Sequence, residues 1–161
     1  MDALDAIRGR RSVRDYTSED VDDSLVRTIL DAGRMAPSGL NNQPWRFRVL
    51  RGGDKDSIAR HTKYGGVIRG APVCIAVFFD ESSGYNRTKD IQAIGACIQN
   101  MLLAIHSLGL GGVWLGEILN RREDVERTLK VEHELMAVIA LGHPAKPGKD
   151  AERRSLGELI I

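Results

Sequence analysis

Four arginines and a serine lie close together near the start of the chain, and their side chains could bind a phosphate group. They fall within the seven residues Arg8–Arg14, which read RGRRSVR. The planar guanidinium group of arginine can donate two parallel hydrogen bonds to phosphate oxygens, and the hydroxyl of Ser12 can add a neutral one. A short basic run is also common on solvated surfaces and at non-specific contacts with polyanions. Taken alone, the segment leaves these interpretations open.

The segment Met35–Trp45, which reads MAPSGLNNQPW, is the second place where the residue types could bind a ligand. It cannot continue the apolar periodic helix before it, because Pro37 and Pro44 lack a backbone donor and Gly39 relaxes the steric limits on the chain. Its serine, asparagine and glutamine side chains can hydrogen-bond to a turn or to a ligand. A plain turn into a strand explains the segment by itself, and only its combination with the arginine segment favours a ligand.

The cysteines and histidines show no spacing that is typical of a metal site or a reactive thiol. Cys74 lies in the apolar run VCIAV and Cys97 in ACI, so we expect both to be buried, inert thiols. The four histidines are unclustered and form no HExxH pattern; they are His61, His106, His133 and His143. We therefore expect no metal site.

The hydrophobic pattern predicts the elements that position these residues. It indicates helices over 2–9, 23–36, 54–63, 87–108 and 121–130, and strands over 46–51, 73–79, 111–115 and 136–141. Asp22 can cap the second helix, whose core face is marked by Val26, Ile29, Leu30 and Gly33. Helices and strands alternate along the chain, which allows either a parallel α/β sheet or an α+β layer fold.

The helix over 87–108 is apolar on more than one side in its second half. Its apolar positions are Ile94, Cys97, Ile98, Met101, Leu102 and Ile105. Such a helix must be buried on several sides, either by a partner subunit or as an ordinary central helix of one domain. Gly95 and Ala96 would permit a close approach, and the apolar tail Leu156–Ile161 also needs a surface on which to pack.

Composition limits the possible functions. The chain has 161 residues, 42% of them hydrophobic, which fits one domain with a real core. Its 23 basic and 22 acidic residues leave a formal charge of +1, so the basic cluster is local and a nucleic-acid partner is disfavoured. The sequence shows neither an apolar run of the roughly 20 residues needed to cross a bilayer nor a signal peptide. We expect no membrane partner and a cytoplasmic location.

The Arg10–Arg14 and Pro37–Trp45 segments together resemble the nitroreductase family of flavin-dependent oxidoreductases. Residues 90–104 followed by 109–116 resemble the family's central helix and the strand after it, and Ala140–Pro144 with Arg153 and Arg154 resemble its last core strand and basic tail. These blocks run in family order from about Ala3 to the C-terminus. The resemblance implies an α+β fold, a three-layer α/β/α sandwich with a mostly antiparallel central sheet. It also implies that residues 1–161 form a single FMN-binding domain in an intertwined homodimer with FMN at the subunit interface.

The resemblance implies a role for each matching residue. Arg10, Arg11 and Ser12 would hold the phosphate and ribityl chain of FMN, and Arg14 would lie toward the pyrimidine edge. The other subunit would contribute Pro37, Ser38, Gly39 and Asn41. Trp114, Leu115 and Gly116 would lie along the isoalloxazine ring, where backbone amides can meet it; the alternative for this stretch is a plain core strand. Arg153 or Arg154 would return to the phosphate.

Two features depart from the family pattern. Many relatives place a basic residue just before the tail arginines, whereas this chain has Glu152, so which of Arg153 and Arg154 reaches the phosphate stays open. The segment Asp80–Asn86 is short where larger relatives insert a helical cover over the flavin. Tyr85, Asn86 and Arg87 could line an abbreviated cover, although a solvated loop is the simpler expectation.

The implied activity is that of an FMN-dependent oxidoreductase that uses NADH or NADPH to reduce nitroaromatics, quinones or similar small planar acceptors by ping-pong hydride transfer. Because the cofactor carries the chemistry, no catalytic side chain is expected. The alternatives are specialised flavin chemistry on the same fold, such as reductive dehalogenation or flavin breakdown, a non-catalytic FMN-binding or sensing protein, and a phosphate- or RNA-binding domain. The sequence does not specify the acceptor or the choice between NADH and NADPH.

Overall fold

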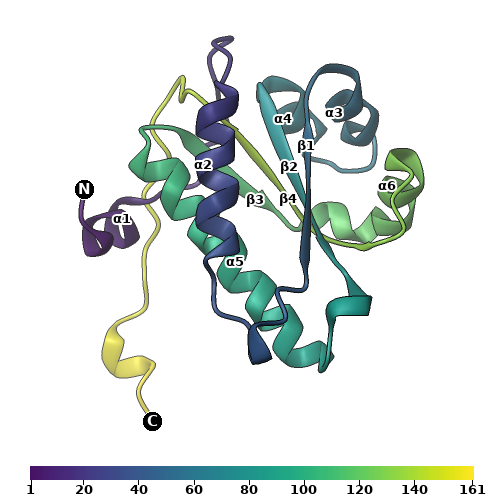
Figure 1. The fold of residues 1–161 in the computed structure, drawn as a ribbon. Helices are drawn as coiled ribbons and strands as arrows, with labels where there is room; N and C mark the ends of the chain where they lie inside the picture. Colours follow the sequence, from purple (N-terminus) through teal and green to yellow (C-terminus); the bar gives the residue numbers. More distant parts are fainter.

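A four-stranded antiparallel sheet forms the centre of the molecule (Figure 1). The computed structural model describes residues 1–161. The strands are β1 (Trp45–Leu50), β2 (Val73–Phe79), β3 (Gly111–Leu115) and β4 (Glu134–Gly142), in the order β1-β2-β4-β3. Every residue of β2 is buried, because β2 and β4 are covered on both faces. β1 and β3 are therefore the two edges of the sheet.

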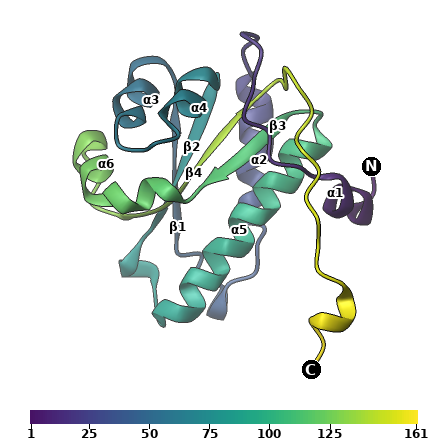
Figure 2. The same cartoon turned by 180° about the vertical axis from the view of Figure 1, so that it is seen from behind.

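Helices cover both faces of this sheet. The helices α2 (Asp23–Arg34) and α5 (Arg87–Ser107) lie on one face, and α3 (Gly52–Ala59), α4 (Gly65–Gly70) and α6 (Arg122–Leu129) lie on the other (Figures 1 and 2). Successive side chains of a strand point to opposite faces, so Ile75 and Val77 join the α2/α5 core while Cys74 and Ala76 join the other. The three-layer α+β architecture predicted from the sequence is confirmed.

The long helix α5 is buried on several sides within one chain. The six apolar residues named in the sequence analysis, Ile94, Cys97, Ile98, Met101, Leu102 and Ile105, are all buried, because the sheet covers one side and α2 packs on another. The hydrogen bond from Asn100 Nδ2 to the Ala32 carbonyl, 3.2 Å long, ties the two helices together. The width of this apolar surface is thus explained by a central helix and gives no separate argument for a partner subunit. Only the side that carries Ile91 and Gly95 is left open.

The region after β1 differs from the sequence prediction. One helix was expected over 54–63, but the chain forms α3 and then the separate short helix α4. The buried Lys55 explains this arrangement, since its Nζ donates to the carbonyls of Arg69 and Ala71 at the end of α4, at 2.9 and 2.6 Å. Asp22 precedes α2 as expected, but its side chain makes no capping hydrogen bond.

The two ends of the chain run beside the sandwich. The helix α1 (Ala3–Gly9) packs on α5, and Asp2 Oδ1 caps it by accepting the Asp5 N–H at 2.9 Å. Beyond residue 150 every residue is exposed, and the tail leads away from the rest of the molecule (Figure 2). Its apolar side chains have no surface to cover them in this chain; they are Leu156, Leu159, Ile160 and Ile161. None of the helices has the combination of length and apolar composition that crossing a bilayer requires.

Candidate functional site

The arginine segment lies against the start of the edge strand β3. Ser12 is bridged to Gly112, and the Val13 N–H donates to the Gly112 carbonyl at 3.0 Å. Gly111 allows this approach, since a Cβ there would stand 2.7 Å from the Val13 side chain. The Arg10–Arg14 segment thus packs against one end of β3 through Gly111 and Gly112. The role of these glycines is visible only in the folded structure, where the two segments meet.

The arginines of this segment differ in how they are engaged. Arg11 donates from Nε to Asp150 at 2.9 Å and from Nη1 to the Arg8 carbonyl at 2.6 Å, so it is tied to the C-terminal segment and to its own helix end. The side chains of Arg10 and Arg14 have no hydrogen-bond or ion-pair partner. Two unpaired guanidinium groups therefore stand near the β3 edge, where they can bind an incoming anion.

The free edge of β3 offers backbone donors. Gly112 points its carbonyl away from β4 toward Val13, and alternate residues of an antiparallel strand share this orientation, so the backbone of Trp114 also points outward. The Trp114 side chain is on the α5 face, opposite Ile139, and is 42% exposed. Trp114 is therefore not a buried core residue. The Leu115 side chain is buried, which leaves only its backbone to contribute, and Gly116 is exposed where the strand ends.

The loop between α2 and β1 holds an unusual backbone conformation. Leu40, Asn41 and Gln43 have positive φ angles of 55°, 55° and 48°. Ser38 Oγ accepts the Gln43 N–H at 3.0 Å and closes the loop on itself. Left-handed non-glycine residues cost free energy and persist where the surroundings hold them, often at binding sites.

An Asn42–Asp90 pair, which the sequence analysis missed, holds that loop in place. Asp90 is 1% exposed and accepts Asn42 Nδ2 at 2.7 Å and the N–H groups of Tyr85 and Asn86 at 3.0 Å. Burial opposes its ionisation, but these hydrogen bonds outweigh burial and lower the pKa of Asp90. Asn42 Oδ1 is buried without a partner. The separation of 48 positions along the sequence hides the pair from any local pattern.

The two motifs lie along different parts of α5. Gly9, directly before the arginine segment, contacts His106 in the last turn of the helix, whereas Pro37 and Gly39 share a cavity with Lys89 and Ala96 in its first half. One chain therefore does not bring Arg10–Arg14 and Pro37–Asn41 together. The tail arginines are also apart from both, since Arg153 Nη1 contacts only the carbonyls of residues 151 and 152 and Arg154 has no polar partner.

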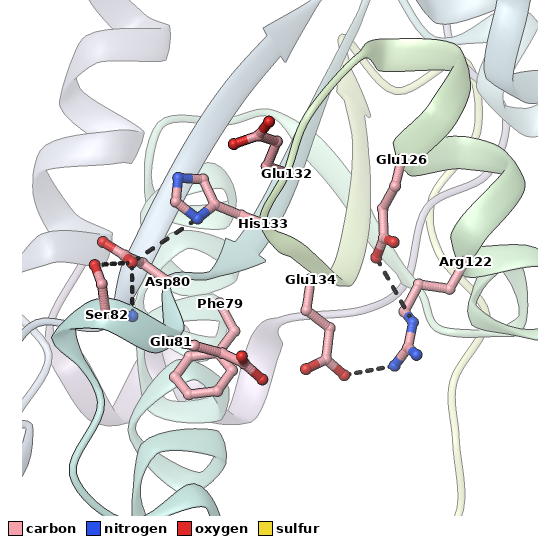
Figure 3. A pocket seen from close by; sticks show the side chains of 9 residues that line it. All are labelled: Phe79, Asp80, Glu81, Ser82, Arg122, Glu126, Glu132, His133 and Glu134. Carbon is pink, nitrogen blue, oxygen red and sulfur yellow. Dashed lines mark hydrogen bonds and ion pairs between the residues drawn. The ribbon is translucent and has the colours of Figure 1, made fainter.

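A polar hollow of about 460 Å³ opens where β2 ends and β4 begins (Figure 3). Its buried carboxylates are already engaged: Asp80 accepts hydrogen bonds from Ser82 and pairs with Arg46, and Glu134 binds Arg87 at 2.8 Å and Arg122 at 2.5 Å. Hydrogen bonds from Ser82 lower the pKa of Asp80 despite its burial. Apart from Glu132, the charged side chains that line this hollow are paired, so we interpret it as a structural ion-pair network.

The two cysteines are far from reactive in this fold. Cys74 and Cys97 are buried as predicted, and burial raises the pKa of each thiol to about 12, which keeps both protonated at neutral pH. No three histidine, cysteine, aspartate or glutamate side chains are grouped closely enough to hold a metal ion.

Comparison with known proteins decides the family. The model of the nitroreductase family matches residues 7–63 and 55–143. The chain belongs to the nitroreductase family. It is 40% identical over 154 residues to a relative from Methanothermobacter thermautotrophicus named for NADH dehydrogenase and NAD(P)H nitroreductase activity, covering 92% of this chain and 81% of that one. It is also 27% identical over 196 residues to an NADH dehydrogenase of Thermus thermophilus, covering 100% and 96% of the two chains.

A solved member of the nitroreductase family has nearly the same fold. The crystal structure of a Desulfovibrio desulfuricans protein described as a nitroreductase, in complex with FMN, superposes with a TM-score of 0.96 at 51% identity, covering 100% of this chain and 96% of that one. The nitroreductase fold predicted from the sequence motifs is therefore confirmed.

Proposed function

We propose that this protein is an FMN-dependent oxidoreductase that uses NADH or NADPH to reduce nitroaromatics, quinones or similar planar acceptors. Residues 1–161 form one FMN-binding domain, and two copies associate as a homodimer with FMN at their interface. The observation that carries the proposal is the pair of unpaired guanidinium groups, Arg10 and Arg14, beside the open backbone edge of β3. The names of the relatives support the same activity.

The donors at the β3 edge fit FMN. Unpaired arginines suit its terminal phosphate, and Ser12 adds a hydroxyl on the same segment. The outward backbone of Trp114 suits the polar edge of the flavin ring, and Arg14 places a cation on the same segment as the phosphate-binding residues. The chain has no GxGxxG turn for a dinucleotide, which favours FMN over FAD. Arg153 or Arg154 reaches the phosphate only if the tail changes its path.

A second chain is needed to complete this site. Pro37, Ser38 and Gly39 lie beside the first half of α5, whereas the arginine segment of the same chain begins beside its last turn, so in this proposal the loop that contacts a given flavin comes from the partner. The open side of α5 around Gly95 and the uncovered apolar tail supply surfaces that a second copy can cover. Flavin binding and dimer formation are therefore linked.

When bound, FMN supplies a carrier that takes two electrons as a hydride from NAD(P)H and passes them to the acceptor. The protein binds and orients this cofactor. Arg10 and Ser12 would hold its phosphate, and the backbone of Trp114–Gly116 together with Arg14 would hold the edge of its ring. For a quinone, the net reaction converts NAD(P)H, one proton and the quinone into NAD(P)⁺ and the hydroquinone. Both substrates use one site in turn, which gives ping-pong kinetics.

The spectrum of the purified protein tests this proposal. We expect a yellow protein that NADH or NADPH bleaches, FMN on acid release and chromatography, and parallel double-reciprocal plots for nicotinamide and quinone. A yellow protein that neither nicotinamide bleaches would instead be an FMN-binding protein without turnover. Finding FAD, or no flavin after reconstitution, overturns the proposal, and intersecting plots overturn the ping-pong mechanism.

A further inference from the structure

A cavity of about 360 Å³ lies between the Pro37–Gln43 loop and the first turns of α5. The loop contributes Pro37, Ser38 and Gly39, and the opposite wall contributes Tyr85, Lys89 and Gln92. Its volume is within the range of small-molecule sites. Because this loop is assigned to the flavin under the proposed function, a molecule in the cavity would lie beside the flavin, where an acceptor must enter.

Tyr85 forms an aromatic wall of this cavity. Gly39 lets the ring settle on the loop, because a Cβ at Gly39 would collide with the Tyr85 hydroxyl. The backbone N–H of Tyr85 donates to the buried Asp90 at 3.0 Å, which fixes the backbone from which the ring projects. Tyr85 itself remains 45% exposed. The short Asp80–Asn86 segment therefore leaves one fixed aromatic face next to the loop, as a flat ligand requires.

Lys89 is the single charged side chain of the lining, and it has no ion-pair partner. Its Nζ lies 5.4 Å from the centre of the Tyr85 ring, and its backbone N–H is fixed by the Asn86 side chain at 3.2 Å. The neighbouring Arg87 instead donates two hydrogen bonds to the Glu134 carboxylate. The next residue in the sequence, Asp90, accepts hydrogen bonds from Asn42 and from backbone N–H groups and does not line the cavity.

We propose that Tyr85 and Lys89 determine acceptor specificity and favour planar acceptors that carry a negative charge, such as aromatic carboxylates. The aromatic ring of the acceptor packs against Tyr85, and its carboxylate meets the ammonium group of Lys89. The inference rests on the proposed function, because it assigns the substrate class of the same site.

The test compares 4-nitrobenzoate with its neutral analogue 4-nitrobenzamide as acceptors of the flavin-loaded protein. The measured quantity is kcat/KM for 4-nitrobenzoate divided by kcat/KM for 4-nitrobenzamide. Comparing this ratio between a variant and the wild type cancels the difference in intrinsic reactivity between the two probes. Lys89→Met should lower this ratio by about three- to tenfold, the range for a partly screened ion pair. Lys89→Arg should restore it, and added salt should reduce it in the wild type. Tyr85→Leu should raise KM for both probes.

Lys63 provides a matched control. Its Nζ stands 5.3 Å from the centre of the adjacent Tyr64 ring, which is nearly the same geometry outside the cavity. Lys63→Met removes the same charge from the surface and should leave the ratio unchanged. A ratio that falls equally in Lys63→Met and Lys89→Met reflects overall charge and overturns the proposal.

The remaining outcomes separate this inference from the proposed function. If the wild type reduces both probes and Lys89→Met leaves their ratio unchanged, the specificity assignment is wrong while the enzyme assignment stands. If Lys89→Met slows bleaching by NADH or NADPH and leaves the acceptor ratio unchanged, the cation serves the phosphates of the nicotinamide and the proposal is overturned. If no flavin binds or neither probe is reduced, the proposed function itself fails.

Discussion

Mixing two defective variants can test whether each flavin site is built from two chains. One variant, Arg10→Ala/Arg14→Ala, removes the unpaired guanidinium groups at β3. The other, Gly39→Trp, fills the partner loop with an indole. Charge-assisted hydrogen bonds contribute about 1.5–3 kcal/mol each, so losing two should weaken FMN binding at least about a hundredfold. Each homodimer alone should therefore retain almost no FMN at a concentration that fills the wild type.

The separation of the two motifs along α5 determines the result for the mixture. In a heterodimer, one site receives both defects, whereas the other combines the intact arginines of one chain with the intact loop of its partner. Random exchange at equal concentrations makes about half of the dimers mixed, and one of their two sites is intact, so about a quarter of the wild-type FMN should return.

Absorbance of retained FMN after desalting measures this recovery, and native mass spectrometry verifies that mixed dimers formed. Mixing either variant with wild type provides the control, because about half of all sites are then intact in both models. If mixed dimers form and no flavin returns, the arginines and loop of one chain serve the same site. That result would refute the inference that the two motifs of one chain lie too far apart to contact the same flavin.

Three further predictions concern single side chains. Arg14→Ala should lower the midpoint potential of bound FMN, by about 30 mV for each 1.4 kcal/mol lost, whereas Arg10→Ala should weaken FMN retention and leave the potential nearly fixed. Spectroelectrochemical titration separates them, and an unchanged potential with lost FMN in Arg14→Ala would make Arg14 a phosphate anchor. Asp90→Asn removes a charged acceptor from three donors and should lower the free energy of unfolding by about 1.5–3 kcal/mol, measured in urea; a change below about 0.5 kcal/mol contradicts the role given to Asp90. Because the pKa of Asp80 is lowered in the folded protein, its ionised form stabilises the fold above about pH 4, and this contribution is lost as the pH falls through the folded-state pKa. The melting temperature of the wild type should therefore fall more steeply below pH 4 than that of Asp80→Asn, and parallel curves would exclude this linkage.

Local pattern was sufficient for the two short apolar strands β2 and β3. The bounds of β2 and β3 agree with the sequence prediction, because Val73–Phe79 and Gly111–Leu115 are apolar runs bounded by turn residues. The helix α4 was not predictable, because three of its six residues are glycine and its end is held by Lys55 from another helix. Its formation depends on tertiary contacts that no short window contains.

The residue types at the site were predictable from the sequence, but the contacts that each side chain makes were not. The sequence places Arg10, Arg11 and Arg14 in one run. Only the path of the C-terminal segment shows that Arg11 forms an ion pair with Asp150. The exposure of Trp114 follows from the position of β3 at the sheet edge, which needs the strand order. The left-handed conformation of Leu40 goes against the preference of its residue type, so it is visible only in the folded backbone.

The open edge of β3 has a consequence for handling the protein without its cofactor. An unpaired strand edge can add a strand from another molecule, and a short bridge to Ser12 protects only the first part of this one. The apo-protein should therefore form intermolecular β-structure and precipitate faster than the flavin-loaded protein at equal concentration. Keeping FMN in excess during expression and purification should extend the time that the protein stays in solution.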